Sequence, residues 1–115
     1  MVILVSGGRD FNDYDSLKLI LDEVATWADD GFVKIVEGDG LGAERMAGKW
    51  AREMGYGAHL VESRYGEPGP QRTQYLIDTF HPSQGVVFSG SGDEAAADVL
   101  VRLFYGGVNT WLVGR

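Results

Sequence analysis

The sequence predicts a doubly wound α/β fold, in which helices cover both faces of a mainly parallel sheet. Short apolar runs alternate along the chain with longer segments in which apolar residues recur at the spacing of a helix. The runs at residues 2–5 (VILV) and 85–88 (GVVF) are apolar on both faces, which is typical of strands inside a parallel sheet. A length of 115 residues suits one core, so we expect one domain, residues 1–115, with five strands and about four helices.

In the first half of the chain, glycine positions and apolar spacing predict two strands and two helices. The strand at residues 2–5 leads to a helix whose amino-terminal cap lies between Asn12 and Asp15 and which ends at Gly31. Its apolar stripe consists of Leu17, Ile20, Leu21, Val24 and Ala28. A second strand, residues 32–36, precedes a helix that runs to about Met54 and is stopped by glycines. The apolar stripe of that helix consists of Ala43, Met46, Ala47, Trp50, Ala51 and Met54.

The second half continues the alternation. A short strand at residues 58–62 is followed by a loop and by a helix that begins at Pro70, a residue suited to the first helical position. One face of this helix consists of Arg72, Thr73, Leu76, Ile77 and Phe80. After a break at Pro82 we expect a strand at residues 85–88, a helix that ends at residues 106–107, and a strand at residues 108–113. The stripe of the last helix consists of Ala96, Val99, Leu100, Leu103 and Phe104.

Glycine clusters follow the first, second and fourth predicted strands. Because the carboxyl ends of parallel strands meet at one edge of a sheet, we expect the three clusters to converge there. A glycine-rich turn before a helix directs backbone N–H groups and the positive end of the helix dipole at an anion such as phosphate. For residues 38–42 (GDGLG) taken alone, a tight strand-to-helix connection explains the glycines almost equally well. The convergence favours a ligand pocket, and its candidate binding residues are Ser6, Gly7, Gly8, Arg9, Asp10, Gly38, Asp39, Gly40, Gly42, Glu44, Gly69, Arg72, Ser89, Gly90, Ser91, Gly92 and Asp93.

The charged residues beside these glycines have both a functional and a structural explanation. Arg9 and Arg72 offer planar, permanently charged groups suited to phosphate, and each could instead form a surface ion pair. Glu44, in the first turn of a helix, is favourable to the helix dipole, and it could also accept hydrogen bonds from ribose hydroxyls. His59 and His81 are expected to be structural.

Composition narrows the range of partners. Ten basic and seventeen acidic residues give a net charge of −7, which argues against a broad grip on duplex nucleic acid. The absence of cysteine excludes disulfides and thiolate chemistry, and we expect neither a metal nor a cofactor beyond a nucleotide-derived ligand. No apolar run approaches the roughly 18 residues of a membrane helix. Met1 leads directly into a strand rather than into a signal peptide, so we expect a cytoplasmic protein without membrane contact.

These motifs together resemble the SLOG superfamily of Rossmann-like proteins, and above all its YspA-type group. The similarity rests on Gly-Gly-Arg-Asp at residues 7–10, the glycine-rich segment at residues 38–44, Trp-Ala at residues 50–51, Gly-Pro-x-Arg at residues 69–72 and the glycine loop at residues 89–93. It covers nearly the whole chain in the same order. The resemblance implies a Rossmann-like domain that recognises a nucleotide or a nucleotide-derived molecule, such as an ADP-ribose-like or cyclic nucleotide signal.

The chain departs from the family pattern in its second half. Thr73 stands where the YspA-type proteins usually have Asn. Residues 89–93 lack the Pro and Thr of the family's phosphate-binding loop, and Asp93 either brings negative charge to this loop or caps the next helix. The more distantly similar LOG phosphoribohydrolases carry a glutamate just after this loop, where the present chain has Ala96, and this argues against LOG-type catalysis.

Three functions remain open on this basis. A sensor, or a phage or bacterial protein that sequesters a signalling nucleotide, fits the glycine loops and the absence of an evident nucleophile. An enzyme that cleaves an N-glycosidic bond in a nucleotide would use Glu44, Asp10 or Asp93 to stabilise an oxocarbenium-like centre or to activate water. A DprA-like grip on single-stranded DNA fits least, because the chain is acidic. The resemblance also implies a homodimer or larger homo-oligomer, for which the candidate contacts, explained equally well by core packing, are Trp27, Tyr105 and Trp111.

Overall fold

The computed structural model describes residues 1–7, 11–38, 42–61, 70–88 and 94–113. Within these residues five strands and four helices alternate along the chain, as the sequence predicts. The strands are β1 (Val2–Gly7), β2 (Lys34–Gly38), β3 (Gly57–Val61), β4 (Gln84–Phe88) and β5 (Asn109–Val113). The helices are α1 (Tyr14–Ala25), α2 (Ala43–Met54), α3 (Pro70–Phe80) and α4 (Glu94–Tyr105).

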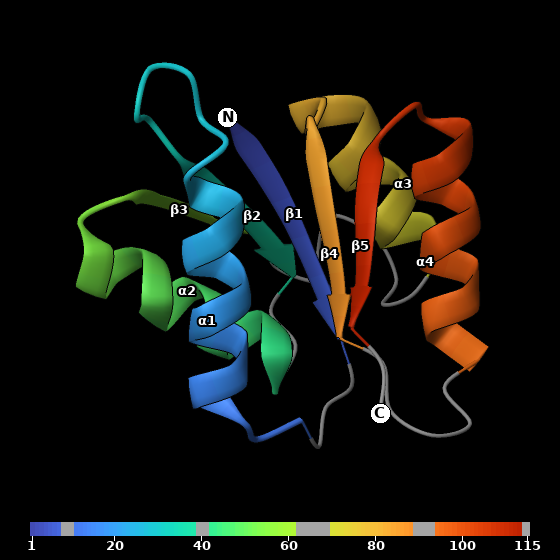
Figure 1. Cartoon of the computed structure of the whole chain (residues 1–115). Coiled ribbons are helices and arrows are strands. Elements are labelled where there is room, and N and C mark those ends of the chain that lie inside the picture. The colour runs from blue at the N-terminus through green and yellow to red at the C-terminus, as the bar shows by residue number, and fades with distance from the viewer. Residues whose placement is uncertain (8–10, 39–41, 62–69, 89–93, 114–115) are drawn as a thin grey trace.

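The strands form one parallel sheet in the order β3-β2-β1-β4-β5. Figure 1 shows α1 and α2 on one face of this sheet and α3 and α4 on the other, so the predicted doubly wound α/β fold is confirmed. The chain builds outward from β1 to β3 and then returns to the other side of β1 to form β4. The border between β1 and β4 is therefore the point at which the strand order reverses, and ligands of such sheets bind at the carboxyl ends of the strands near this point.

Alternate residues of the central strands supply two separate cores, one on each face of the sheet. Ile3, Val5 and Ile35 lie in the core under α1 and α2, which also contains Leu17, Leu21 and Trp50. The intervening residues Leu4 and Val36 lie in the core under α3 and α4, with Leu76, Ile77, Val99 and Leu103. This period of two, with apolar residues on both faces, is the reason why the strand sequences read as continuous apolar runs.

The predicted end of the first helix is wrong. Helix α1 ends at Ala25 rather than at Gly31, because the Thr26 hydroxyl donates to the Glu23 carbonyl oxygen at 2.6 Å. The next N–H groups then bond to carbonyls only three residues back, which tightens the chain into turns. Gly31, with φ of 71°, lies in the turns that lead to β2.

Two aromatic residues, one predicted to begin a strand and one predicted to lie in the apolar stripe of a helix, are exposed. Phe32 precedes β2, which begins at Lys34 and not at residue 32, and the Phe32 side chain is 62% exposed. Phe104 belongs to α4, but it is 75% exposed and lies outside the core that Ala96, Val99 and Leu103 form. The other predicted helix and strand limits in the described residues differ from the observed ones by at most two residues.

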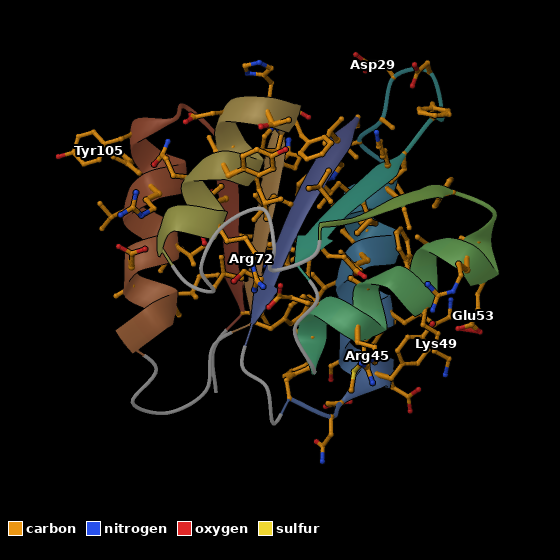
Figure 2. All side chains as sticks on the ribbon, turned by 180° about the vertical axis from the view of Figure 1, so that it is seen from behind. Asp29, Arg45, Lys49, Glu53, Arg72 and Tyr105 are labelled. Atoms are coloured by element: carbon orange, nitrogen blue, oxygen red, sulfur yellow. The ribbon has the colours of Figure 1, made fainter. Side chains whose placement is uncertain are left out.

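The three aromatic residues considered as oligomer contacts differ in their surroundings. Trp27 and Trp111 stack on each other with ring centroids 5.9 Å apart, which joins the end of the α1 region to the edge strand β5. Tyr105 is 83% exposed at the end of α4 (Figure 2). Along the part of the chain that the structure describes, no helix has the length and apolar character needed to cross a membrane.

Trp50 is the largest fully buried side chain, and its indole N–H donates to the Asp22 carboxylate at 2.9 Å. We expect Trp50→Phe to lower the free energy of unfolding by about 1.5 kcal/mol, because the hydrogen bond between α2 and α1 is lost and a small cavity is created. Urea unfolding monitored by circular dichroism tests this. Trp27→Phe, at a position with a half-exposed indole, is the matched control and should change stability by less than about 0.5 kcal/mol.

Candidate functional site

The last residue of β1, Gly7, is packed so closely that it leaves no room for a side chain. A β-carbon at Gly7 would lie 2.5 Å from the Ala43 Cβ, 2.8 Å from the Phe88 carbonyl oxygen and 3.1 Å from the Phe88 Cβ. The end of β1, the end of β4 and the start of α2 therefore meet at one point. Figure 1 shows these ends together at the lower edge of the sheet. They are the described segments that flank the three glycine clusters.

The segment after the first glycine cluster also returns to this point. The Phe11 ring packs on the Phe88 ring with centroids 5.1 Å apart and an angle of 43° between the ring planes. Phe88 is fully buried at the end of β4, so Phe11 closes the core just below the carboxyl edge of the sheet. Because Phe88 pairs with Gly7 in the sheet, the aromatic pair places apolar rings next to Gly7.

Gly42 sets the start of α2. Its φ of 76° and ψ of −130° are accessible to glycine but strained for other residues. As the N-cap residue it offers no side-chain oxygen to the first turn of the helix. Ala43, the first helical residue, is fully buried against Gly7, so the amino-terminal end of α2 is held directly against the end of β1. The N–H groups of the first turn of α2 and its helix dipole give this edge of the sheet a positive electrostatic potential.

An ion pair joins the starts of α2 and α3 across the carboxyl edge of the sheet. The Arg72 guanidinium lies 3.5 Å from the Glu44 carboxylate, and the two side chains are only 11% and 13% exposed. Figure 2 shows Arg72 near the centre of the molecule, whereas Arg45, Lys49 and Glu53 lie along the outer side of α2. Arg72 therefore has a carboxylate partner, as the structural explanation required, but the pair is largely buried and lies beside the Gly7 region.

A second carboxyl group, that of Glu37, is buried under α2. Glu37 is the penultimate residue of β2, it is 6% exposed, and its Oε2 atom has no hydrogen-bond partner among the described residues. Its carboxyl group lies against Gly48, where a β-carbon would be 2.7 Å from Oε1 and 3.0 Å from Oε2. A glycine in the middle of α2 thus provides the space that the Glu37 carboxyl group occupies.

Burial raises the pKa of the Glu37 carboxyl group to about 7, and the nearby Glu44 carboxylate contributes to the increase. The Gly48 backbone N–H, Arg52 and Arg45 act in the opposite direction by stabilising the charged form. Glu37 therefore titrates near neutral pH, whereas Glu44 is held beside the Arg72 cation. The site thus contains two carboxyl groups in different electrostatic environments.

The structure brings together the described members of the predicted binding set. Ser6 and Gly7 end β1, Gly38 ends β2, Gly42 and Glu44 begin α2, and Arg72 lies in the first turn of α3. The remaining predicted residues lie outside the described residues: Gly8, Arg9, Asp10, Asp39, Gly40, Gly69, Ser89, Gly90, Ser91, Gly92 and Asp93. Of the three candidate catalytic residues, Glu44 lies in the described part of the chain, and Asp10 and Asp93 lie outside it.

Sequence reasoning missed Glu37 and Gly48. Two signals were available for them. Glu37 is a charged residue at the end of an otherwise apolar strand, and Gly48 interrupts the good helix formers of α2. Each is unfavourable for the element that contains it, and the structure shows that they contact each other.

The structure also has a cavity away from the carboxyl edge of the sheet. A cavity of about 260 Å³ lies at the opposite edge of the sheet, lined by Ile77, Asp78, His81, Pro82, Gly106 and Val108. It is distant from the carboxyl edge, where the functional groups converge. In the residues that the structure describes, no group of three or more His, Asp or Glu side chains is arranged to hold a metal ion.

Comparison with known protein families gives one match. The family model described as YAcAr, the YspA, cpYpsA-related SLOG family, matches residues 1–62. This match spans β1 to β3, so it includes Gly7, Glu37, Glu44 and Gly48. No curated protein and no solved structure matches the chain.

Proposed function

The chain belongs to the YspA, cpYpsA-related SLOG family, and from this premise we propose that it binds a nucleotide or a nucleotide-derived small molecule at the carboxyl edge of its sheet. The ligand would be an ADP-ribose-like or cyclic nucleotide signal. The protein would act in the cytoplasm as a sensor or as a sequestering protein, and it would release the ligand chemically unchanged.

The observation that carries the proposal is the meeting of β1, β4 and α2 at Gly7. The close packing of Gly7 on Ala43 and Phe88 holds the start of α2 directly against the carboxyl ends of β1 and β4. The N–H groups at a helix start are donors suited to the oxygen atoms of a phosphate group. The position, at the reversal of strand order, is where ligands of doubly wound sheets bind.

Glu44 and Arg72 supply complementary chemistry beside this point. Their separation of 3.5 Å is long for a hydrogen bond, so the two groups are held near each other without a tight mutual contact. The guanidinium of Arg72 suits a phosphate oxygen pair, and the carboxylate of Glu44 suits the hydroxyl groups of a ribose. A nucleotide contains both a phosphate group and ribose hydroxyl groups, whereas inorganic phosphate lacks the ribose.

Mass spectrometry of the small molecules released on denaturation tests the proposal most directly. The purified protein is examined first as isolated and then after incubation with NAD, ADP-ribose and linear and cyclic nucleotides. We expect an intact ligand that also raises the melting temperature of the native protein, since binding to the folded state alone stabilises it. If no nucleotide is retained and none shifts the melting temperature, the proposal is wrong.

Arg72→Ala is expected to weaken binding of the retained nucleotide at least tenfold, because a charge-assisted hydrogen bond to phosphate contributes about 1.5–3 kcal/mol. Isothermal titration calorimetry measures the change. Arg102→Ala is the matched control, because Arg102 lies in the last turn of α4 and bonds to Asp98 and Gln74. If wild type and Arg72→Ala bind the nucleotide with equal affinity, Arg72 does not contact the ligand.

A second candidate function is hydrolysis of the N-glycosidic bond of a nucleotide, and the pair of carboxyl groups favours it. Glu44 beside Arg72 is suited to stabilise an oxocarbenium-like centre. Burial raises the pKa of the Glu37 carboxyl group to about 7, which suits proton transfer near neutral pH. Chromatography of the incubated nucleotides distinguishes the two functions, since an enzyme produces a free base and a ribose phosphate. If alanine at Glu44, Asp10 and Asp93 leaves such hydrolysis unchanged, this mechanism is excluded.

A further inference from the structure

Glu37 interrupts an apolar row on β2. Ile35 in β2 and Val33 just before it share the same alternation, and both are fully buried in the core under α2. Glu37 continues this row, with its carboxyl group under α2 and its Oε2 atom without a hydrogen-bond partner among the described residues. A buried polar atom without a partner is unfavourable for folding, and an apolar side chain of similar volume would fill this position at lower cost.

Gly48 lowers the stability of α2, and it leaves the space that the Glu37 carboxyl group occupies. Glycine in a helix interior is less stable than alanine, and α2 has helical residues on both sides of this position. The added β-carbon of an alanine would lie 2.7 Å and 3.0 Å from the two Glu37 oxygen atoms. The chain thus combines two unfavourable residues in one contact, a pattern that is expected where function and not stability determines the sequence.

The charges around Glu37 are unbalanced. On α2, Glu44 lies one turn before Gly48 and Arg52 one turn after it. The exposed Arg45, on the outer side of α2, acts on the Glu37 carboxyl group only through its charge. On α3, Arg72 is paired with Glu44 and not with Glu37. The facing strand β1 has no titratable side chain, and on β3 the only one, His59, is at the register position of Val36. In the described residues Glu37 thus has a carboxylate neighbour and no cation within salt-bridge distance.

We propose that Glu37 is the proton-accepting residue of the ligand site, so that an anionic nucleotide bound at the start of α2 is taken up together with one proton. This inference rests on the proposed function and extends it to the chemistry of binding. The phosphate groups add negative charge near the end of β2, where the Glu44 carboxylate is already balanced by Arg72. A proton from solvent adds to the Glu37 carboxylate, removes its charge, and so removes the repulsion between Glu37 and the ligand.

The coupling is reciprocal, because a ligand that raises the proton affinity of Glu37 must itself bind more tightly when Glu37 is protonated. In the free protein Glu37 titrates at about pH 7. In the complex its pKa is higher, since the nearby phosphate charge disfavours the carboxylate further. Between these two pKa values each bound ligand takes up one proton, and the affinity falls as the pH rises.

The test uses ADP-ribose as the probe, because its diphosphate and adenine do not titrate between pH 6 and pH 9. Titration calorimetry in this range should show a dissociation constant that increases by up to about tenfold per pH unit above pH 7. The observed heat should depend on the ionisation enthalpy of the buffer. Glu37→Gln should bind with an affinity that does not vary with pH and with a heat that is independent of buffer. Glu53→Gln, the same substitution at the far end of α2, should behave as wild type.

The outcomes separate the two proposals. If Glu37→Gln retains the pH and buffer dependence of wild type, Glu37 is not the proton-accepting residue, although nucleotide binding stands. If wild type binds ADP-ribose at no pH and retains no other nucleotide, both proposals fail. A second measurement needs no variant: the carboxyl carbon of Glu37, followed by NMR, should titrate at a higher pH with ADP-ribose than without it. An unchanged midpoint overturns the inference.

Discussion

Replacing Gly7 with alanine is expected to lower the free energy of unfolding by about 3 kcal/mol, because the new methyl group overlaps rigid atoms. The β-carbon would lie 2.5 Å from the Ala43 Cβ and 2.8 Å from the Phe88 carbonyl oxygen. Neither can rotate away, since the first is at the buried start of α2 and the second belongs to the backbone of a central strand. Relief requires that α2 moves away from β1, so we also expect the variant to lose the proposed nucleotide binding.

Urea unfolding followed by tryptophan fluorescence measures this change. Gly57→Ala is the matched control, because a β-carbon at Gly57 in β3 would meet Lys34 Cγ at an ordinary 3.7 Å. The control should change stability by less than about 0.5 kcal/mol. A Gly7→Ala protein as stable as wild type would contradict the close packing of α2 on the end of β1.

The second large effect concerns the dependence of stability on pH. Glu37 in the folded protein has a pKa of about 7, above the ordinary value of 4.5 that it has in the unfolded chain. Between these values the folded state binds the proton and the unfolded state does not, so the free energy of unfolding falls as the pH rises. Below pH 4.5 the carboxyl group is protonated in both the folded and the unfolded state, so the free energy of unfolding is not reduced. Above pH 7 the free energy of unfolding is reduced by the full amount. The shift corresponds to roughly 3 kcal/mol.

Glu37→Gln removes this titration, so we expect the stability difference between variant and wild type to increase by roughly 3 kcal/mol in favour of the variant between pH 4 and pH 8. Chemical unfolding at several pH values measures the difference, and Glu53→Gln serves as the control for loss of one acidic group. A constant difference across this range would mean that Glu37 titrates as an ordinary carboxyl group.

The fold could be predicted because its signals are local. The apolar runs of β1 and β4 and the helical spacing of α2 each reflect burial on faces that the sequence itself specifies. The errors occurred where a single side chain decides the outcome. The Thr26 hydroxyl ends α1 by capturing the Glu23 carbonyl oxygen, and the apolar spacing through Ala28 contains no sign of this. Phe104 has the correct spacing for a buried residue, but it lies on the side of α4 that faces away from the sheet.

For the candidate site, the sequence predicted the edge of the sheet at which Gly7, Glu44 and Arg72 lie, but it did not point to Glu37. The sequence could point to Gly7, Glu44 and Arg72, because glycine clusters and arginines commonly bind phosphates. The Glu37–Gly48 contact was not, because it depends on how far α2 approaches β2, and this distance follows from the packing of Trp50, Ala47 and Ala51. Glu37 and Gly48 are each unusual within their own element, but neither element shows by itself that the two residues contact each other.

The central place of β1 has a consequence for how the chain reaches its native state. Ile3 pairs with Gln84, so the middle of the sheet cannot close until the sequence through β4 is present. Residues 1–61 contain the sequences of β1, β2, β3, α1 and α2, but the helices that cover Leu4 and Val36 on the other face, α3 and α4, come later in the chain. A nascent chain at that stage exposes an apolar surface, and folding must proceed through contacts of high sequence separation, which is slow. We therefore expect one late, cooperative folding transition and a need for protection from aggregation during synthesis.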